Sequence, residues 1–160
     1  MPNRRRAPAD TIFRMAVEGD IPALKQFRCE NPGEPWTRAP ELIVNMQVPS
    51  WIGAPATLVC VAERSEQIVG VIAVTTSPGN PSVYLSQVLA VAHPHRRLYI
   101  GYRLKLYAAV LVAQGGGVFI SSEVDVENTA MQRCNDCFDA YSVEAPELHD
   151  TLVTVMRLCS

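Results

Sequence analysis

The sequence predicts a mixed α/β domain in which an antiparallel meander of strands leads into a strand–helix–strand crossover. Two apolar, β-branched segments, residues 57–63 and 67–75, are separated by only three residues, as in a hairpin. In the second half, strand-like segments alternate with helix-like ones, which is typical of a crossover unit. A doubly wound sheet is not expected, because the strands of the first half have no helices between them.

The first half of the chain is predicted to build the meander. Residues 11–16 alternate between apolar and polar side chains, as a half-buried strand does. Asp20 is the expected cap of a following helix, because Pro22 stands in its first turn. A loop rich in Pro and Gly follows over residues 30–40, then a helix over 40–48 that ends before Pro49, then the hairpin.

The second half is predicted to build the crossover. Three consecutive glycines end its first helix, and Asn128 is the expected cap of its second helix. The predicted elements are a turn at 77–81, a strand at 83–91, a helix at 102–114, a strand at 118–124, a helix at 129–138 and a strand at 152–158.

Length and composition describe an ordinary globular chain. Of its 160 residues, 48% are hydrophobic and 19% are charged, which excludes wholesale disorder. The longest apolar run covers residues 107–113, far short of the ~20 residues that span a bilayer. We therefore expect a cytoplasmic protein with a disordered basic tail at residues 1–10 and one domain over residues 11–160.

The five cysteines are expected to be free thiols. Their number is odd, and a cytoplasmic chain keeps thiols reduced. Cys134 and Cys137 form a C-x-x-C pair, but no second pair or suitably spaced histidine accompanies it. The sequence therefore predicts no metal site.

Acidic residues are missing from a long central segment. No Asp or Glu occurs in the 56 residues between positions 67 and 122, where the chain average predicts five or six. A buried sheet that avoids charge explains most of this gap. It does not explain why the remaining charges are all positive, namely Arg96, Arg97, Arg103 and Lys105. This pattern favours a bound anion.

The segment VLAVAHPHRRLYIG, residues 88–101, is predicted to place that anion. It reads as a strand, a basic turn and the start of a helix. The first turn of a helix presents unpaired backbone N–H groups and the positive end of the helix dipole, so it receives phosphate readily. Gly101 would let a phosphate approach the backbone closely.

This segment resembles the signature of the GNAT acyltransferase superfamily, in which Arg or Gln is followed by two residues, Gly, one residue, and Gly or Ala. Here the signature is the run from Arg96 to Gly101, after a strand that ends in Val91. The segment SEVDVENTAMQRCN is similar to the family's strand–Asn–helix segment, with Asn128 opening the helix.

The resemblance implies a mixed sheet of six to seven strands with about four helices, and acetyl-CoA as co-substrate. The pyrophosphate would bind the amides of residues 97–102, and the pantetheine arm would pair with the strand before them. The implied cofactor-binding residues are Leu89, Ala90, Val91, Arg96, Arg97, Leu98, Tyr99, Ile100, Gly101, Tyr102, Asn128 and Asn135. The implied reaction is direct attack by a primary amine in a ternary complex.

The chain also departs from the family pattern. Tyr99 stands where the signature has its first glycine, and Asn135 stands where the family often has the tyrosine that protonates the leaving thiolate. The candidate general base is Glu123, with Asp125 a weaker candidate. The candidates for the missing acid are Tyr84, Tyr141 and Cys134.

Three functions stay open on the sequence. The first is an N-acetyltransferase acting on an amine of a small molecule or a protein, as a monomer or homodimer, without nucleic acid or membrane partners. The second is an acyl-CoA-binding sensor of the same fold with weak catalysis. The third is an unrelated α/β domain whose basic turn binds another phosphate ligand.

Overall fold

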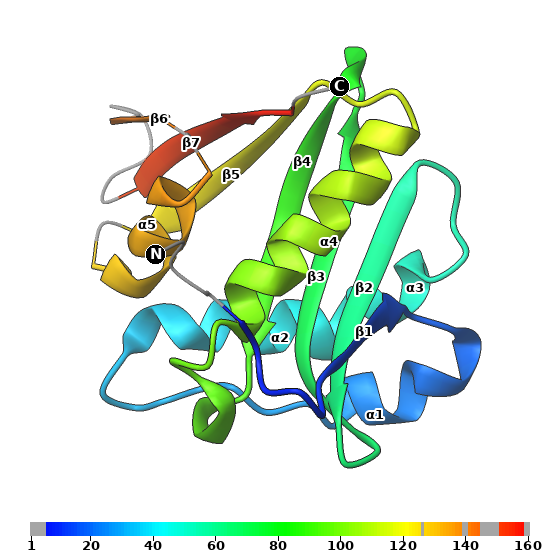
Figure 1. The fold of residues 1–160 in the computed structure, drawn as a ribbon, viewed down its shortest axis with the longest axis vertical. Helices are drawn as coiled ribbons and strands as arrows, with labels where there is room; N and C mark the ends of the chain where they lie inside the picture. The colour runs from blue at the N-terminus through cyan, green and yellow to red at the C-terminus, as the bar shows by residue number, and fades with distance from the viewer. Residues whose placement is uncertain (1–5, 126, 139–140, 145–150, 159–160) are drawn as a thin grey trace.

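The computed structural model describes residues 6–125, 127–138, 141–144 and 151–158, and its core is one mixed β-sheet (Figure 1). The sheet has the order β1-β2-β3-β4-β5-β7-β6, and β4 and β5 form the only parallel pair among the described strands. The strands are β1 (Ile12–Met15), β2 (Thr57–Arg64), β3 (Gln67–Ser77), β4 (Asn80–Val91), β5 (Phe119–Asp125), β6 (Tyr141–Glu144) and β7 (Thr151–Arg157). The predicted fold class is confirmed.

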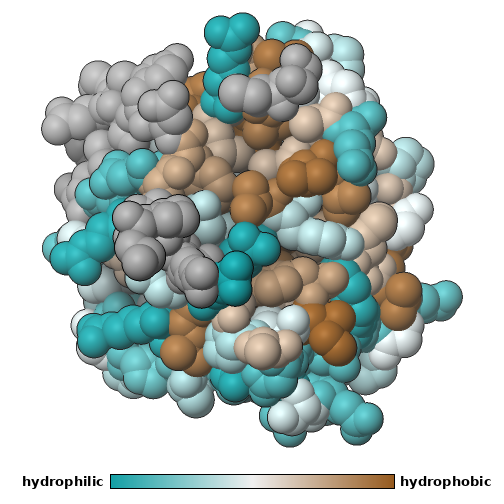
Figure 2. Space-filling model, viewed as in Figure 1, coloured by the Kyte–Doolittle hydropathy of each residue, from teal (hydrophilic) through white to brown (hydrophobic). Residues whose placement is uncertain are grey.

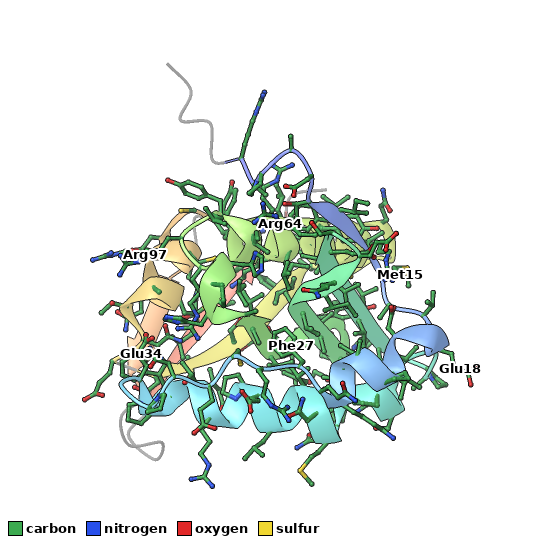
Figure 3. All side chains as sticks on the ribbon, turned by 90° about the horizontal axis from the view of Figure 1, so that it is seen from below. Met15, Glu18, Phe27, Glu34, Arg64 and Arg97 are labelled. Atoms are coloured by element: carbon green, nitrogen blue, oxygen red, sulfur yellow. The ribbon has the colours of Figure 1, made fainter. Side chains whose placement is uncertain are left out.

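Helices cover both faces of the sheet. The long helix α4 (Ile100–Gln114) crosses one face, and α1, α2 and α3 lie on the other, as the view from below shows (Figure 3). Phe27 projects into the layer between the sheet and α2 in that view. The remaining bounds are α1 (Ile21–Lys25), α2 (Arg38–Met46), α3 (Val48–Trp51) and α5 (Thr129–Asp136).

The two faces bury separate hydrophobic clusters. Under α4, side chains such as Ile72, Leu104 and Ile120 pack together, whereas Leu24, Val44 and Val71 fill the opposite face. A Cβ at Gly70 would lie 2.8 Å from the Leu104 side chain, so this glycine lets α4 approach the sheet closely. Apolar surface extends over the α4 face between hydrophilic margins (Figure 2).

Four details differ from the sequence prediction. Asp20 begins α1 but does not cap it, because its carboxylate binds Arg14 and the amide of Val17. Helix α2 ends at Met46, before Pro49 as predicted, but a further short helix, α3, follows and has Pro49 in its first turn, where proline is tolerated. Strand β6 was not predicted. In the segment expected to be a disordered tail, Ala7 packs against the core and Asp10 pairs with Arg64, while residues 1–5 lie outside the described residues.

A β-bulge divides β4 into two parts. Ala73 of β3 pairs with Val88, but Val74 pairs with Ser86, which leaves Gln87 as an extra residue. Because side chains alternate along a strand, the bulge reverses the phase: Tyr84 faces α4 before it, and Leu89 and Val91 face α4 after it.

Candidate functional site

Strands β4 and β5 are joined over only part of their length. Their parallel pairing runs from Val83 with Phe119 to Ser86 with Ser122, and it stops beside the Gln87 bulge. From there to Val91, β4 has β3 as its only strand partner among the described residues. We call the segment Gln87–Val91, which includes the predicted Leu89 and Ala90, the open edge. Its backbone can pair with an extended ligand, as a further strand would.

The turn after the open edge presents backbone amides. Arg97 and Tyr99 have left-handed backbone conformations, with φ of 62° and 59°. Non-glycine residues pay about 1–2 kcal/mol for this conformation, and turns of this kind aim N–H groups into a concave, anion-binding surface. No side chain caps the first turn of α4. Leu98 and Ile100 point into the core, so these two predicted residues could bind a ligand only through their backbone.

Gly101 lies directly above the end of the open edge. A Cβ added there would meet the Val91 side chain at 3.5 Å, an ordinary contact, and nothing else within 4 Å. The fold itself therefore has room for a side chain at this position. The predicted reason for the glycine, close approach by a phosphate, is consistent with that space but is not tested by it.

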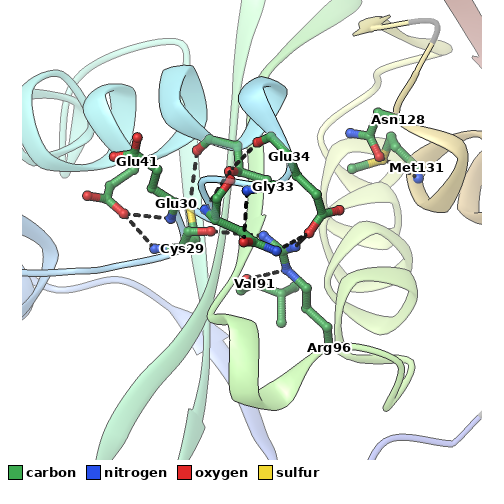
Figure 4. Close-up of polar contacts among 11 residues, drawn as sticks. Cys29, Glu30, Gly33, Glu34, Glu41, Val91, Arg96, Asn128 and Met131 are labelled. Atoms are coloured by element: carbon green, nitrogen blue, oxygen red, sulfur yellow. Dashed lines mark hydrogen bonds and ion pairs between the residues drawn. The ribbon is translucent and has the colours of Figure 1, made fainter.

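Arg96 is engaged by the protein, contrary to the expectation that it adds free positive charge to the turn. Its guanidinium donates to Glu34 at 2.8 Å, to the Cys29 carbonyl at 2.9 Å and to the Val91 carbonyl at 3.3 Å (Figure 4). Arg96 thus ties the loop before α2 to the end of β4. Arg97 is exposed and is the arginine whose position leaves it accessible to an anion.

The carboxylates of β5 face away from α4. Ile120 packs under α4, and Ser122 and Val124 share its phase and are buried. Glu123 and Asp125 have the opposite phase, so they lie on the face that carries α1 to α3. Glu123 therefore shares a face of the sheet with α2 and α3.

Asn128 caps α5, as predicted. Its side-chain oxygen accepts a hydrogen bond from the amide of Met131 at 3.1 Å. This hydrogen bond engages the side-chain oxygen and fixes the orientation of the side-chain amide. A cofactor contact through the side-chain nitrogen is compatible with this geometry.

Asn135 is buried, and its partner is Lys105, which the sequence pattern identifies only as part of a basic cluster. Lys105 and Asn135 are each 2% exposed, and the Lys105 ammonium donates to the Asn135 side-chain oxygen. The Asn135 side-chain nitrogen is buried without a hydrogen-bond partner. Burial lowers the pKa of Lys105, and the Phe138 ring lies 5.7 Å from its ammonium. The signal available in the sequence was the four-residue spacing from Gly101, which puts Lys105 on the same helix face.

The acid candidates fare differently. Burial raises the pKa of the Cys134 thiol to about 11, so it is protonated at neutral pH. Tyr84 packs at the far, paired end of β4, beside Gly117. The side chain of Tyr141 lies outside the described residues. Burial also raises the pKa values of Cys29 and Cys60 to about 11 and about 12, which makes these thiols unreactive.

The described residues contain no group of His, Cys, Asp and Glu side chains that could hold a metal ion. The four cysteines among them, at positions 29, 60, 134 and 137, are free thiols. Within the same residues, no helix is long and apolar enough to cross a membrane.

Comparison with known proteins identifies the family. The model of the acetyltransferase (GNAT) family matches residues 21–135, and the chain belongs to this family. It is accordingly an acetyltransferase, and enzymes of the family use acetyl-CoA. No curated protein sequence gives a significant match.

Solved structures share the fold at low sequence identity. A GNAT acetyltransferase from Streptococcus pneumoniae superposes with a TM-score of 0.71 at 11% identity, covering 93% of this chain and 99% of the other. The diaminobutyrate acetyltransferase of Paenibacillus lautus, solved with L-2,4-diaminobutyric acid and coenzyme A, gives 0.65 at 19%, covering 94% and 96%. The ribosomal-protein-S18-alanine N-acetyltransferase of Escherichia coli gives 0.68 at 12%, covering 94% and 95%. Their named acceptors range from a small diamine to a protein, so the fold does not select an acceptor class.

Proposed function

We propose that the chain transfers the acetyl group of acetyl-CoA to a primary amine by direct attack in a ternary complex. The observation that carries the proposal is the open edge of β4, which leads directly to the uncapped first turn of α4. A pantetheine arm has the amides to pair with such an edge, and a pyrophosphate suits the helix start at its end.

The cofactor would use backbone groups more than side chains. Amides of residues 97–102 would hold the pyrophosphate, with Arg97 adding charge at the surface. The backbone groups of Leu89, Ala90 and Val91 would pair with the pantetheine arm. Asn128 would donate a hydrogen bond to the cofactor from its side-chain nitrogen. As the amine attacks, an amide of the open edge would donate to the thioester oxygen, on which negative charge develops.

The acceptor would approach from the face that carries α1 to α3. An amine must be neutral to attack, so its proton has to leave during or before the reaction. Glu123 lies on that face and would accept this proton directly or through water. The acceptor is proposed as a small molecule or a peptide amine, in a monomeric or homodimeric enzyme.

Thermal unfolding with acetyl-CoA, beside ATP and NAD, is the first test. At a ligand concentration one hundred times the dissociation constant, binding adds ~2.7 kcal/mol to the free energy of unfolding, which is several degrees in Tm. Release of free thiol from acetyl-CoA with a panel of diamines, aminoglycosides and peptides then tests turnover. Equal protection by ATP or NAD would contradict the proposal.

The second candidate is an acyl-CoA sensor with weak catalysis, and it is favoured by Asn135, which stands where the family often has a tyrosine that can protonate the thiolate. A shift in Tm specific to acetyl-CoA, with no thiol release across the panel, would establish this alternative. Thiol release that requires an amine would exclude it.

A further inference from the structure

Lys105 is the least expected charged residue in the core. The chain has only two lysines, and the other, Lys25, is exposed on α1. Lys105 is 2% exposed, and its described partners are the Asn135 oxygen and the face of the Phe138 ring. Burying an ammonium is strongly unfavourable unless an anion or several acceptors compensate its charge. Because no carboxylate pairs with Lys105 among the described residues, its charge has no complement within this part of the protein.

The position of Lys105 relates it to the open edge. Helix α4 runs antiparallel to β4, since Gly101 contacts Val91 near the end of the strand and Gly117 contacts Tyr84 near its beginning. Lys105 lies one turn beyond Gly101 on the same helix face, further along the direction in which an arm entering at Gly101 would run. Its contact with Asn135 reaches from α4 to α5, that is, from the β4 side of the opening to the β5 side.

The chemistry of acetyl-CoA indicates which of its groups the Lys105 ammonium could stabilise. The pyrophosphate of acetyl-CoA belongs at the exposed helix start, where Arg97 and the amides lie. The pantetheine arm that continues inward carries amides and a hydroxyl, and these are neutral. Its sulfur is the only atom of the arm that gains negative charge, and it does so when acyl transfer breaks the bond between sulfur and the carbonyl carbon.

We propose that the Lys105 ammonium, held in place by Asn135, stabilises and protonates the thiolate of coenzyme A as it leaves. This inference rests on the proposed acetyl transfer. The amine nitrogen forms a bond with the acetyl carbon, and the carbon–sulfur bond breaks with its electron pair on sulfur. Lys105 gives one proton to that sulfur and becomes a neutral amine. The proton released by the attacking nitrogen leaves through Glu123 or water, and solvent restores the proton on Lys105.

Burial gives Lys105 suitable acidity for this step. Its pKa is lowered by desolvation, which brings the ammonium nearer in acidity to a thiol. The titratable neighbours of Lys105 are two thiols and a phenol. Cys134 lies on α5, Cys137 directly follows that helix, and Tyr102 on α4 contacts the Phe138 ring that faces the ammonium.

The direct test measures the pH at which the thiol of bound coenzyme A ionises, and it does not depend on turnover. Bound coenzyme A is titrated by the ultraviolet absorbance of its thiolate, in the wild type and in Lys105→Met, with Lys25→Met as the matched control. A nearby ammonium favours the thiolate, so we expect the bound thiol to ionise at lower pH in the wild type and in Lys25→Met than in Lys105→Met. Desulfo-coenzyme A, which lacks the sulfur, should bind all three proteins equally.

Kinetics supply the second readout. Lys105→Met should lower kcat for acetyl-CoA about 100-fold, as loss of a general acid does, with the dissociation constant of desulfo-coenzyme A unchanged. The kcat of the wild type should fall at alkaline pH as Lys105 loses its proton, and this limb should be absent in Lys105→Met. Asn135→Asp, which sets a carboxylate beside Lys105, should move the limb to higher pH and tests the same group if Lys105→Met does not fold.

Three results would overturn the inference. They are a bound thiol that ionises at the same pH with and without Lys105, an alkaline limb that persists in Lys105→Met, and equal loss of affinity for coenzyme A and desulfo-coenzyme A. The last would assign Lys105 to another part of the cofactor. Failure of the underlying proposal looks different, because a wild type that neither binds acetyl-CoA nor releases thiol refutes acetyl transfer itself.

Discussion

The two parts of β4 on either side of Gln87 differ in how completely the protein satisfies its own groups. Before the bulge, β4 is hydrogen-bonded to strands on both sides, and Gly117 packs so tightly that a Cβ would meet Val112 at 2.3 Å. After the bulge, the strand has one partner, α4 starts without a cap, and the Asn135 nitrogen is unpaired. The paired part satisfies its backbone groups within the chain, whereas the open part leaves groups that the proposed cofactor would satisfy.

This contrast indicates where sequence changes will affect stability and where they will affect binding. In the paired part, substitutions should act on the free energy of unfolding, because every contact there is made within the chain. In the open part, the same kinds of substitution should leave folding intact, or improve it, while reducing affinity for acetyl-CoA or turnover.

The largest effect is expected where the open part buries uncompensated polar groups. The double variant Lys105→Met/Asn135→Leu should raise the free energy of unfolding by about 1–4 kcal/mol, because apolar side chains replace a desolvated polar pair. The lowered pKa of Lys105 means that the unfolded wild type binds more protons between that pKa and the ordinary lysine value. Wild-type stability should therefore rise with pH across that window, and the advantage of the variant should shrink there. Urea titrations at neutral and alkaline pH measure both.

Glycine substitutions compare the two parts directly. Gly117→Ala should lower the free energy of unfolding by about 1–3 kcal/mol, since the new Cβ overlaps Val112 and crowds Tyr84. Gly101→Val should leave unfolding within about 1 kcal/mol of the wild type, yet weaken acetyl-CoA binding about tenfold or more, which is about 1.4 kcal/mol. Thermal unfolding and calorimetric titration give the two quantities. Equal destabilisation by both changes would remove the distinction.

The two arginines of the turn should differ in the same way, Arg96 acting on stability and Arg97 on affinity for acetyl-CoA. Arg96→Ala removes a hydrogen-bond donor from Glu34 and from the carbonyls of Cys29 and Val91, so it should cost about 1–3 kcal/mol of stability. Arg97→Ala should change stability by less than about 0.5 kcal/mol and weaken acetyl-CoA binding, most visibly at low salt. Binding measured at two ionic strengths checks this. Undiminished affinity in Arg97→Ala would show that the backbone alone holds the phosphates.

The last comparison concerns Asn128, where the expected loss of stability is smaller than at Gly117 or Arg96. Asn128→Ala removes the cap of α5 and should cost about 0.5–2 kcal/mol. Asn128→Asp keeps a capping oxygen, so its stability should match the wild type, but it lacks the nitrogen donor proposed to contact the cofactor. We expect both variants to bind acetyl-CoA more weakly. An Asn128→Asp protein with full affinity would leave the residue as a cap only.

Local sequence patterns were sufficient to predict most of the fold. The hairpin, the glycine stop after α4 and the Asn128 cap depend on residues close together in the chain, and the structure confirms each of them. Strand β6 was missed because nothing in its four residues separates it from a loop; it exists through pairing with β7. The ends of β4 were also placed correctly to within three residues, although its bulge was not foreseen.

The site was harder to predict because its side chains form hydrogen bonds with residues that are distant in the sequence. Arg96 carries the right charge for a phosphate, but Glu34 and the Cys29 carbonyl, more than 60 residues away, engage it. From the sequence alone, Lys105 looks like one charge of a basic cluster. In the structure it is buried and contacts Asn135 of α5. The predicted backbone contributions depend only on the local strand–turn–helix order. They therefore remain the firmest part of the proposed cofactor site.

The pairing of β4 with β5 stops beside a single extra residue, Gln87. Deleting Gln87 would place Ser86 and Val88 in succession opposite Val74 and Ala73, which restores simple alternation along β4 and keeps Leu89 and Val91 on the α4 face. The neighbouring strand could then continue to pair past Ser86, closing the space assigned to the cofactor. A loss of three nucleotides is thus a short evolutionary route from an enzyme of this family to a continuous, ligand-free sheet, and an insertion at the same place is an equally short route back.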